Sequence, residues 1–381
     1  MTVPFLVSIV GTRPEAIKMA PVARALAQLG GIEHEVYLTG QHRGLEGHFD
    51  VPPSSLRQLG FNPRDRDVAR VRAALRALLC GHFSRRPVDL VLVHGDTTSA
   101  AAGALAARDC GIAIGHVEAG LRSFDLDRPW PEESHRMAID ALAELLFAPT
   151  EQSARNLRKE PRVKGRILVT GNTGIDALLE VQAGIARPPD AGAGERRRPI
   201  LVTCHRRENQ GEPARAVCGA LRRMAAELPV RIAAPLHLNP LARGPFEAAL
   251  AGADHVETLE PQSYEAMVRL MDWSWLILTD SGGLQEEAPA LGRPLLVLRD
   301  VTERPEALAT GNLELVGTDP DRIFDAVAGL LADPEKYARM ARPAFPFGDG
   351  RASVRIAEAI GEWLEERGNG TSGRDPPTRS P

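Results

Sequence analysis

The sequence predicts an α/β protein made of two Rossmann-like domains, each with a doubly wound parallel sheet. Short apolar runs such as Phe5–Val10 and Val88–Val93 are typical of buried strands. Helical stretches alternate with these runs, which favours parallel strands joined by crossover helices. The alternation restarts after a glycine-, proline- and arginine-rich stretch at Gly184–Pro199, and a chain of 381 residues exceeds one ordinary core. We therefore expect two domains that face a central cleft.

In the first half of the chain, strands and helices are expected to alternate. Pro14 suits the first turn of its helix, because the missing N–H is not needed there. Residues 47–66 are marked by proline, arginine and glycine and are predicted to form a mobile loop. The predicted strands are Phe5–Val10, Glu35–Leu38, Val88–Val93, Ile112–Ile114 and Arg166–Val169. The predicted helices are Pro14–Leu29, Val68–Phe83, Thr97–Ala107, Ser134–Leu146 and Gln152–Lys159.

The second half repeats the pattern and gives the domain boundaries. Domain one is expected to span residues 1–170 and domain two residues 171–351, with Gly171-Asn172-Thr173 as the crossing point. Residues 368–381 have no apolar content and are predicted to be disordered. The predicted strands are Ile200–Cys204, Val230–Ala234, Leu276–Thr279 and Pro294–Leu298. The predicted helices are Pro213–Leu228, Pro245–Ala251, Gly283–Leu291, Asp321–Ala332, Pro334–Ala341 and Ala352–Arg367.

Composition argues against several classes of protein. A formal net charge of −4 disfavours a nucleic-acid surface. No apolar run reaches the ~18 residues of a membrane helix, and the first residues lack the charge pattern of a signal peptide. The four cysteines lack C-x-x-C spacing and are expected to be reduced thiols in a cytoplasmic protein. No cluster has metal-ligand spacing, and a G-x-G-x-x-G dinucleotide motif is missing.

Three acidic residues lie at or just past the ends of apolar runs. Asp96 and Glu118 follow two consecutive predicted strands, and Glu132 lies in a proline-marked loop. In an open parallel sheet, ligands collect outside the carboxyl ends of the strands. These acids are therefore predicted to share an active site. The alternative is that each acid caps a helix or pairs with an arginine, the candidates being Arg122, Arg128 and Arg136.

Basic residues and helix starts provide candidate anion sites. Backbone N–H groups at the helix start after Gly11, with Arg13 and Lys18 one turn apart, are predicted to bind an anion. The alternative there is that Thr12 caps the helix and Arg13 is solvated. Ser281, Gly282 and Gly283 open another helix, whose amides could hold a phosphate because glycine permits close approach.

Several motifs, taken together and in order, resemble the non-hydrolysing UDP-N-acetylglucosamine 2-epimerase family. The resemblance covers about residues 3 to 365 and implies the glycosyltransferase-B fold, in which the last helix, Ala352–Arg367, returns to the N-terminal domain. The motifs are GTRPEAIKMAP (11–21), TGQHR (39–43), HGDTT (94–98), HVEAGLRS (116–123), PWPEE (129–133), HRREN (205–209), HLNP (237–240) and DSGGLQEEAPALGRPLLVLRDVTERPEA (280–307).

The resemblance implies inversion at C2 of a UDP-N-acetyl sugar. The C2 proton is too weakly acidic for simple abstraction, because no ring carbonyl is adjacent. The family avoids a carbanion by expelling UDP to give 2-acetamidoglucal and then adding UDP back with protonation on the opposite face. This route needs a base, an acid and strong stabilisation of the departing diphosphate.

The family's residues map onto this sequence position by position. Asp96, Glu118 and Glu132 match its acid/base carboxylates, whose pKa values can split when they cluster. His205 matches the histidine placed against the leaving phosphate, and Glu287 matches the carboxylate that binds the ribose. The neighbouring Glu286 is expected to be solvated. The remaining substrate-binding matches are Arg13, Lys18, Arg136, His237, Ser281, Gly282 and Gly283.

Two regions depart from the family pattern. Phe124 replaces a loop glycine, and Asp127-Arg128 replace Tyr-Ser, which could reshape the sugar end of the site. Bacterial members also carry a second, activating UDP-GlcNAc, but Gly44 stands where a longer polar residue is usual. We therefore expect weak or absent activation. The residues that match parts of this second site are Gln41, Arg43, Arg206, Arg207 and His237.

Other functions remain open at this stage. A hydrolysing epimerase would release ManNAc and UDP, and an epimerase of a related UDP-N-acetyl sugar would differ at C6. A glycosyltransferase would leave three acids near C2 unexplained, and a UDP-sugar sensor would bind without turnover. The resemblance implies a homodimer with a small-molecule substrate, no cofactor and no metal, and neither nucleic acid nor membrane as a partner.

Overall fold

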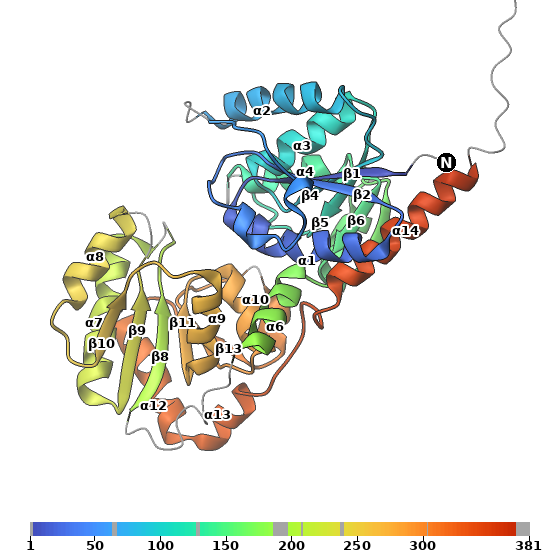
Figure 1. Ribbon diagram of the computed structural model, residues 1–381. Helices are drawn as coiled ribbons and strands as arrows, with labels where there is room; N and C mark the ends of the chain where they lie inside the picture. Colours follow the sequence, from blue (N-terminus) through green and yellow to red (C-terminus); the bar gives the residue numbers. More distant parts are fainter. Residues whose placement is uncertain are drawn as a thin grey trace, which may run out of the picture. The chain divides into compact units, whose positions relative to one another are not determined.

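The structure is a computed structural model that describes residues 3–62, 67–126, 130–185, 197–206, 209–236, 240–302 and 304–370. The chain divides into two compact units, each with one parallel sheet flanked by helices (Figure 1). Unit 1 comprises the residues up to Ala177 and those from Gly348 onward, and unit 2 comprises Leu178–Phe347. The predicted class, α/β with two parallel Rossmann-like sheets, is confirmed.

The sheet of unit 1 has seven parallel strands in the order β3-β2-β1-β4-β5-β6-β7. The direction of winding changes between β1 and β4, and ligands bind at such a switch point in doubly wound folds. The strands are β1 (Phe5–Val10), β2 (Glu33–Leu38), β3 (Leu56–Gln58), β4 (Leu90–His94), β5 (Ala113–Val117), β6 (Leu145–Ala148) and β7 (Arg166–Val169).

Helices cover both faces of this sheet because its strands are apolar on both sides. Leu6 and Val10 of β1 pack in one apolar cluster, whereas Val7 and Ile9 pack in the other. In Figure 1, α1 and α14 lie on one face, and α2 and α3 lie on the other. The helices of this unit are α1 (Arg13–Leu29), α2 (Val68–Phe83), α3 (Thr98–Asp109), α4 (Glu132–Asp140), α5 (Glu151–Lys159) and α14 (Ala352–Gly370).

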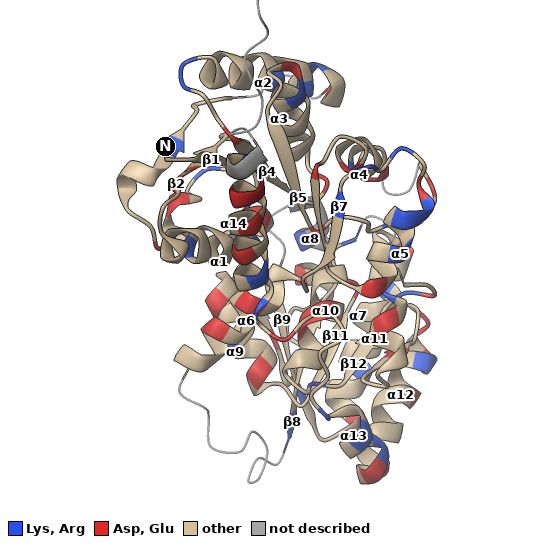
Figure 2. Cartoon of the chain, turned by 90° about the vertical axis from the view of Figure 1, so that its right-hand side faces the viewer, with Lys and Arg blue, Asp and Glu red and all other residues tan. Residues whose placement is uncertain are grey.

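Helix α14 belongs to unit 1 although it ends the described chain. Its apolar face, with Ile356, Ile360 and Trp363, is buried in the same cluster as α1, and the helix also carries acidic residues, coloured red in Figure 2. Asp176 of α6 (Thr173–Gly184) accepts hydrogen bonds from the first turn of α14, including Ser353 N at 2.7 Å. The boundaries between the units therefore lie at 177/178 and 347/348 instead of the predicted 170/171 and 351/352.

The sheet of unit 2 has six parallel strands in the order β10-β9-β8-β11-β12-β13. Helices α7, α8 and α12 contribute to the large apolar cluster against this sheet. The strands are β8 (Arg198–Thr203), β9 (Val230–Pro235), β10 (Val256–Leu259), β11 (Leu276–Thr279), β12 (Leu295–Val297) and β13 (Leu313–Leu315). The remaining helices are α7 (Glu212–Glu227), α8 (Pro240–Leu250), α9 (Tyr264–Trp273), α10 (Gly282–Ala290), α11 (Pro305–Ala309), α12 (Pro320–Ala332) and α13 (Pro334–Met340).

Several local predictions are wrong. The predicted strand Ile112–Ile114 extends to Val117, because it pairs with β4 and β6 on either side. The predicted helix Ser134–Leu146 is helix α4 followed by strand β6, whose apolar residues pair with β5 and β7. Residues 368–370 continue α14 instead of starting a disordered tail, and residues 371–381 lie outside the described part of the chain.

The predicted loop 47–66 also contains ordered structure. Two short 3-10 helices, η1 (Glu46–His48) and η2 (Pro53–Ser55), precede β3, which pairs with β2 at the edge of the sheet. Strands β10 and β13 and helices α9 and α11 were not predicted, because their apolar patterns are too short to stand out.

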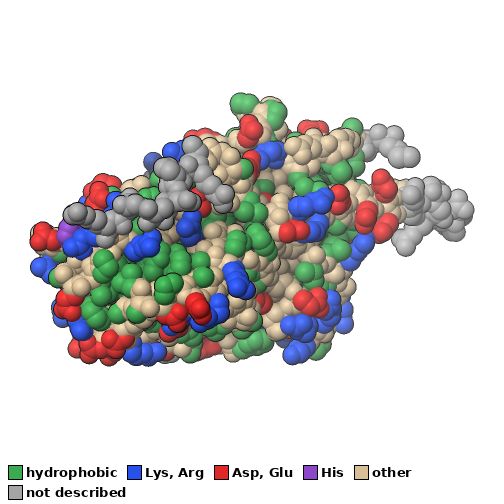
Figure 3. All heavy atoms as spheres, turned by 90° about the horizontal axis from the view of Figure 1, so that it is seen from below, with side chains coloured by type: hydrophobic (Ala, Val, Ile, Leu, Met, Phe, Trp, Pro, Cys, Tyr) green, Lys and Arg blue, Asp and Glu red, His purple; other side chains and the backbone are tan. Residues whose placement is uncertain are grey.

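The surface carries mixed charge. None of the helices in the described part of the chain is both long and apolar enough to cross a membrane. On the face seen in Figure 3, lysine and arginine side chains are interspersed with aspartate and glutamate, and apolar side chains lie between them.

Candidate active site

The ends of β4 and β5 bring two of the predicted acids to one edge of the first sheet. Asp96 lies two residues beyond β4, and Glu118 lies one residue beyond β5. The two strand ends are neighbours, because Gly95 N donates to Val117 O at 2.9 Å. A Cβ added at Gly95 would lie 3.2 Å from Glu118 Oε2, so a larger residue there would crowd this carboxylate.

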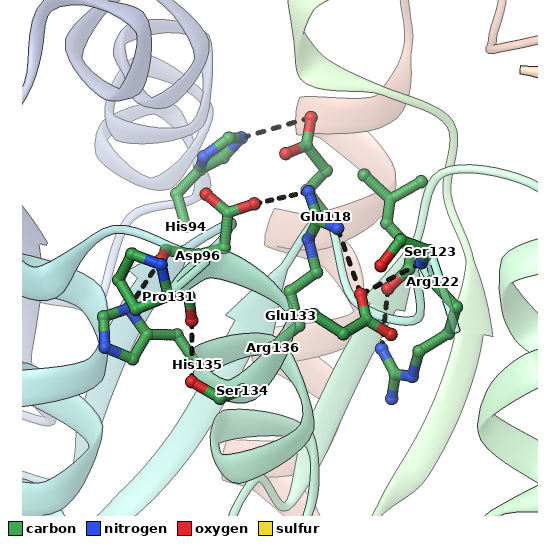
Figure 4. A network of polar contacts seen from close by, with 12 residues as sticks. His94, Asp96, Glu118, Arg122, Ser123, Pro131, Glu133, Ser134, His135 and Arg136 are labelled. Atoms are coloured by element: carbon green, nitrogen blue, oxygen red, sulfur yellow. Dashed lines mark hydrogen bonds and ion pairs between the residues drawn. The ribbon is translucent and has the colours of Figure 1, made fainter. Parts of the chain in front are cut away.

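Asp96 pairs with an arginine from helix α4. Its Oδ2 lies 2.6 Å from a guanidinium nitrogen of Arg136, and another nitrogen of this guanidinium lies 3.3 Å from Glu133 Oε2. Figure 4 shows Arg136 between these two carboxylates. Asp96 therefore forms an ion pair with Arg136, one of the arginine partners named as the alternative in the sequence. Because the Asp96 side chain is still 23% exposed, it remains accessible to a substrate.

Glu118 has polar neighbours from several segments of the described chain, and its backbone conformation is unusual. Its Oε1 forms an ion pair with Lys18 and lies 3.4 Å from Asn172 Nδ2. His94 Nε2 approaches the same oxygen at 4.0 Å. The φ angle of Glu118 is +69°, in the left-handed region that costs free energy for a residue with a Cβ. Such strain is often found at functional sites.

His94 presents a neutral imidazole to Glu118. The side chain is buried, and burial lowers its pKa to about 4, with Glu118 opposing the shift. Its Nε2 has no hydrogen-bond partner among the described residues. An unpartnered buried polar atom is costly in a folded protein, so the position of His94 beside Glu118 makes it a further candidate for the site.

Glu132 is the first residue of α4, not part of a loop as predicted. The helix begins there after Pro131, and a carboxylate in the first turn is stabilised by the helix dipole. Glu132 Oε2 is buried without a hydrogen-bond partner in the described part of the chain. The next residue, Glu133, instead accepts hydrogen bonds from Ser123 N and Phe124 N at 3.0 and 3.2 Å.

The amides at the start of α1 do not form the predicted anion site. Glu15 Oε2 accepts hydrogen bonds from Gly11 N at 3.0 Å and Thr12 N at 2.7 Å. His42 Nδ1 accepts the hydrogen bond of Arg13 N at 3.2 Å. The protein's own carboxylate thus occupies this helix start, and only the side chains of Arg13 and Lys18 remain as candidate anion ligands.

In unit 2, a buried carboxylate organises the loop that carries His205. Asp280, which is fully buried, accepts hydrogen bonds from His205 N at 2.9 Å and Arg206 N at 2.8 Å. The ring Nδ1 of His205 lies 3.7 Å from Asp280 Oδ1, and its side chain is 36% exposed. Asp280 therefore fixes the backbone of His205. Asp280 itself directly precedes Ser281, the residue that caps the start of α10.

An arginine from another segment, not singled out from the sequence, lies against the start of α10. A Cβ added at Gly282 would lie 3.1 Å from the Arg304 guanidinium carbon, so this cation lies against the first residue of the helix. Arg304 also pairs with Glu286 at 3.0 Å, and Glu286 is buried instead of solvated as expected. A helix N-terminus beside a guanidinium favours an anion such as a phosphate.

Glu287 lies on α10 and faces Tyr264 of α9. The Tyr264 hydroxyl donates to Glu287 Oε1 at 3.1 Å. Burial and then the Glu287 charge raise the pKa of Tyr264 far above its usual range, so the hydroxyl stays protonated and acts as a donor. This hydrogen bond orients the Glu287 carboxylate, whose oxygens act only as hydrogen-bond acceptors.

Some predicted residues cannot be placed. His237, Arg207 and Arg128 lie outside the described residues. Of the residues matched to a second nucleotide site, Gln41 accepts a hydrogen bond from Ser99 Oγ at 2.8 Å, and the side chain of Arg43 is exposed.

Several described residues of the site were not singled out from the sequence, including Glu15, His94, Asn172 and Arg304. Each lies inside a motif or a crossing segment that was recognised, but its partner is distant in the chain. Glu15 also receives a hydrogen bond from Thr97 Oγ1 at 2.6 Å, and these residues are 82 positions apart. Only the position of Glu15 in the first turn of a helix, where acids are favoured, was a usable signal.

Comparison with known proteins places the chain among relatives of one family. The family model described as UDP-N-acetylglucosamine 2-epimerase matches residues 24–361. An enzyme of that name from Yersinia pestis is 44% identical over 373 residues, which cover 93% of this chain and 98% of the relative. A crystal structure of the Neisseria meningitidis UDP-GlcNAc 2-epimerase, bound to UDP-GlcNAc, is 39% identical with a TM-score of 0.85, covering 94% of this chain and 100% of that chain.

A more distant structure extends the likeness of the fold. The glycosyltransferase WaaG, involved in lipopolysaccharide biosynthesis, is 16% identical with a TM-score of 0.62 and covers 93% of this chain and 99% of that chain. At this identity only the fold is shared. The family match and the close relatives go further: the chain belongs to the UDP-N-acetylglucosamine 2-epimerase family of isomerases.

Proposed function

We propose that this protein interconverts UDP-N-acetylglucosamine and UDP-N-acetylmannosamine without net hydrolysis. The observation that carries the proposal is the convergence of Asp96 and Glu118 at adjacent strand ends, beside the buried His94. Glu132 adds a carboxylate oxygen that is buried without a hydrogen-bond partner among the described residues. Carboxylates of this kind can supply both a base and an acid for proton transfer at one carbon.

In the proposed reaction, one carboxylate takes the proton from C2 while the bond between C1 and the UDP oxygen breaks. The electron pair of the C–H bond forms the C1–C2 double bond of 2-acetamidoglucal, and the pair of the C–O bond leaves with UDP. In the return step UDP adds to C1, and a carboxylic acid on the opposite face protonates C2. One proton leaves C2 and another is added there, so substrate and product have the same composition and the reaction is an isomerisation.

The nucleotide end of the substrate is assigned to residues of unit 2. The start of α10, with Ser281, Gly282 and Gly283, would hold the diphosphate by its amides, and Arg304 adds a positive charge there. His205 would act on the leaving phosphate, and Glu287 would accept hydrogen bonds from the ribose hydroxyls. Such preorganised donors stabilise the charge that develops as UDP departs.

The experiment that tests the proposal is proton NMR of UDP-GlcNAc with the protein in D2O. We expect UDP-ManNAc to appear, with deuterium incorporated at C2 of both sugars and no accumulation of free ManNAc. A matched sample with the Asp96→Asn variant should lose both signals. The same measurement with a UDP-N-acetyl sugar that differs at C6 reports the substrate preference.

The alternatives give different spectra. Accumulation of free ManNAc and UDP would make the protein a hydrolysing epimerase. Binding of UDP without deuterium at C2 would make it a sensor, and turnover that requires an added acceptor would make it a glycosyltransferase. The dimeric state that the family resemblance implies can be measured on the same preparation by light scattering.

A further inference from the structure

Two buried histidines contact the two peptide groups that flank the Cα of Asp96. His116 Nε2 lies 2.8 Å from the carbonyl oxygen of Gly95, and His135 Nδ1 lies 2.9 Å from the carbonyl oxygen of Asp96 itself. These carbonyls belong to the peptide groups before and after the Asp96 Cα. Because a carbonyl oxygen only accepts hydrogen bonds, both rings act as donors here.

We propose that His116 and His135 are positioning residues, an "Asp96 clamp", that hold the Asp96 carboxylate in place for proton transfer at the sugar. The proposal rests on the proposed epimerase function for its catalytic consequence. Fixing the peptide groups on both sides of a residue fixes the direction of its Cα–Cβ bond, and therefore the arc on which its carboxylate can lie. Neither histidine belongs to the residues that the family resemblance assigns to substrate.

The clamp also links the segments that carry the other two acids. His116 lies on β5, two residues before Glu118, and His135 lies on α4, the helix that begins with Glu132. The contacts from His116 and His135 to the loop at Gly95 and Asp96 therefore join all three segments. A reaction that uses opposite faces of one carbon needs fixed spacing between its acid and its base, and the clamp provides that spacing.

His116 is itself held by a second contact. Its Nδ1 lies 2.6 Å from Asp140 Oδ1, and both side chains are fully buried. Arg122 donates to the other oxygen of Asp140 at 2.6 Å, and His116 and Arg122 lower the pKa of Asp140 despite burial. With a carboxylate on one nitrogen and a carbonyl on the other, the His116 ring donates from both nitrogens.

His135, unlike His116, donates a hydrogen bond from only one of its ring nitrogens. Burial lowers its pKa, so the ring is neutral, and its single proton lies on Nδ1, where the Asp96 carbonyl accepts it. Its Nε2 is buried without a hydrogen-bond partner among the described residues. In Figure 4 the His135 ring points toward the backbone of Asp96, whereas the neighbouring Arg136 reaches the Asp96 carboxylate. Successive residues of α4 thus hold the backbone and the side chain of one acid.

The test compares variants that keep the donor with variants that remove it. The amide nitrogen of asparagine can take the place of histidine Nδ1, so His135→Asn keeps the hydrogen bond, whereas His135→Leu removes it at similar volume. For His116 the corresponding pair is His116→Gln and His116→Leu. His255→Asn, at an exposed position in unit 2, is the control. The readouts are kcat and KM for UDP-GlcNAc epimerisation.

We expect His135→Leu and His116→Leu to lower kcat about 10- to 100-fold, because small misplacements of a catalytic group cost that much, with KM within about threefold. His135→Asn, His116→Gln and His255→Asn should stay within about threefold of the wild-type kcat on the same scale. Equal losses in the leucine and amide variants, or full activity in the leucine variants, would overturn the clamp.

A measurement on the wild-type protein tests the clamp even where a variant fails to fold. Two-dimensional NMR of protein labelled with ¹⁵N-histidine should show His135 protonated on Nδ1 alone and His116 protonated on both nitrogens. A proton on Nε2 of His135, or a singly protonated His116, overturns the clamp without reference to activity. A wild-type protein that shows these signals but no deuterium exchange at C2 would instead refute the proposed function.

Discussion

The ammonium group of Lys18 forms an ion pair with the carboxylate of Glu118 at the end of β5. Lys18 comes from the second turn of α1, and the two residues are 100 positions apart in the chain. A side chain that is a candidate phosphate ligand thus contacts a candidate proton-transfer group. This contact makes Glu118 the most informative residue to change first.

Glu118→Gln should abolish epimerisation and leave nucleotide binding intact. Glutamine keeps the size of the side chain but cannot exchange a proton, so we expect kcat to fall at least about 100-fold. UDP affinity, measured by calorimetry, should change little, because the nucleotide end is assigned to other residues. Glu144→Gln, at an exposed glutamate of the same unit, is the control. A kcat within tenfold of wild type in Glu118→Gln would exclude Glu118 as the acid or base.

The start of α10 allows a matched pair of glycine substitutions. A Cβ at Gly282 would lie 3.1 Å from the Arg304 guanidinium, whereas among the described residues the atom nearest to a Cβ at Gly283 is Ser281 Oγ, at 3.8 Å. Gly282→Ala should displace Arg304 and weaken UDP binding about tenfold, the effect of losing roughly 1.4 kcal/mol of a charge-assisted contact. Gly283→Ala should weaken UDP binding less. Equal losses of UDP affinity in the two variants, measured by calorimetry, would show that Arg304 does not contribute to binding of the diphosphate.

The buried network around Asp140 should be important for stability. Removing its carboxylate in Asp140→Ala takes a shared anionic partner from the buried side chains of His116 and Arg122, although Arg122 keeps its pair with Glu160. Breaking one side of a buried ion pair costs about 3–5 kcal/mol of unfolding free energy, whereas an exposed pair contributes about 1 kcal/mol or less. Glu151→Ala, which breaks the exposed pair with Arg158, is therefore the control in urea denaturation. Similar losses in both variants would contradict this account.

Glu15 should make the stability of the protein depend on pH. Burial raises its pKa from 4.5 to about 7, although hydroxyl and amide donors, Thr97 first, oppose the shift. Between pH 4.5 and about pH 7, Glu15 keeps a proton in the folded protein that it has lost in the unfolded chain. The unfolding free energy contributed by this group is therefore full below pH 4.5 and falls as the pH rises toward 7, by on the order of 3 kcal/mol.

The comparison that isolates this effect is Glu15→Gln, which has no titrating group at that position. Denaturant curves of both proteins at a series of pH values should show the wild type losing stability relative to the variant across this window. A difference that does not change with pH would show that the carboxylate stays ionised throughout.

Activation by a second nucleotide sugar should be weak or absent. Gly44 has no side chain where bacterial relatives are expected to have a longer polar one. Conversion of UDP-ManNAc alone should therefore start without a lag, and added traces of UDP-GlcNAc should not raise the initial rate. Strict dependence on added UDP-GlcNAc, followed by NMR, would contradict this prediction.

The sequence by itself determined the class of fold, and it singled out three candidate acids. Buried strands such as Phe5–Val10 and Leu276–Thr279 are readable because the apolar run and its turn residues are local signals. Asp96 and Glu118 were identified for the same reason: each follows the end of a strand, and parallel strands end at one edge. Short edge strands such as Leu56–Gln58 were missed, because three residues carry too weak a pattern.

Only the tertiary structure decided what these residues contact. The sequence did not reveal the hydrogen bond from Thr97 to Glu15, or the contacts of His116 and His135 with the backbone at Gly95 and Asp96. In each case the partners come from segments far apart in the chain. Glu286 looked solvated from its sequence neighbours but is buried against Arg304. Burial and pairing depend on which elements pack together, and the free energy of that packing is shared over the whole fold instead of residing in any local stretch.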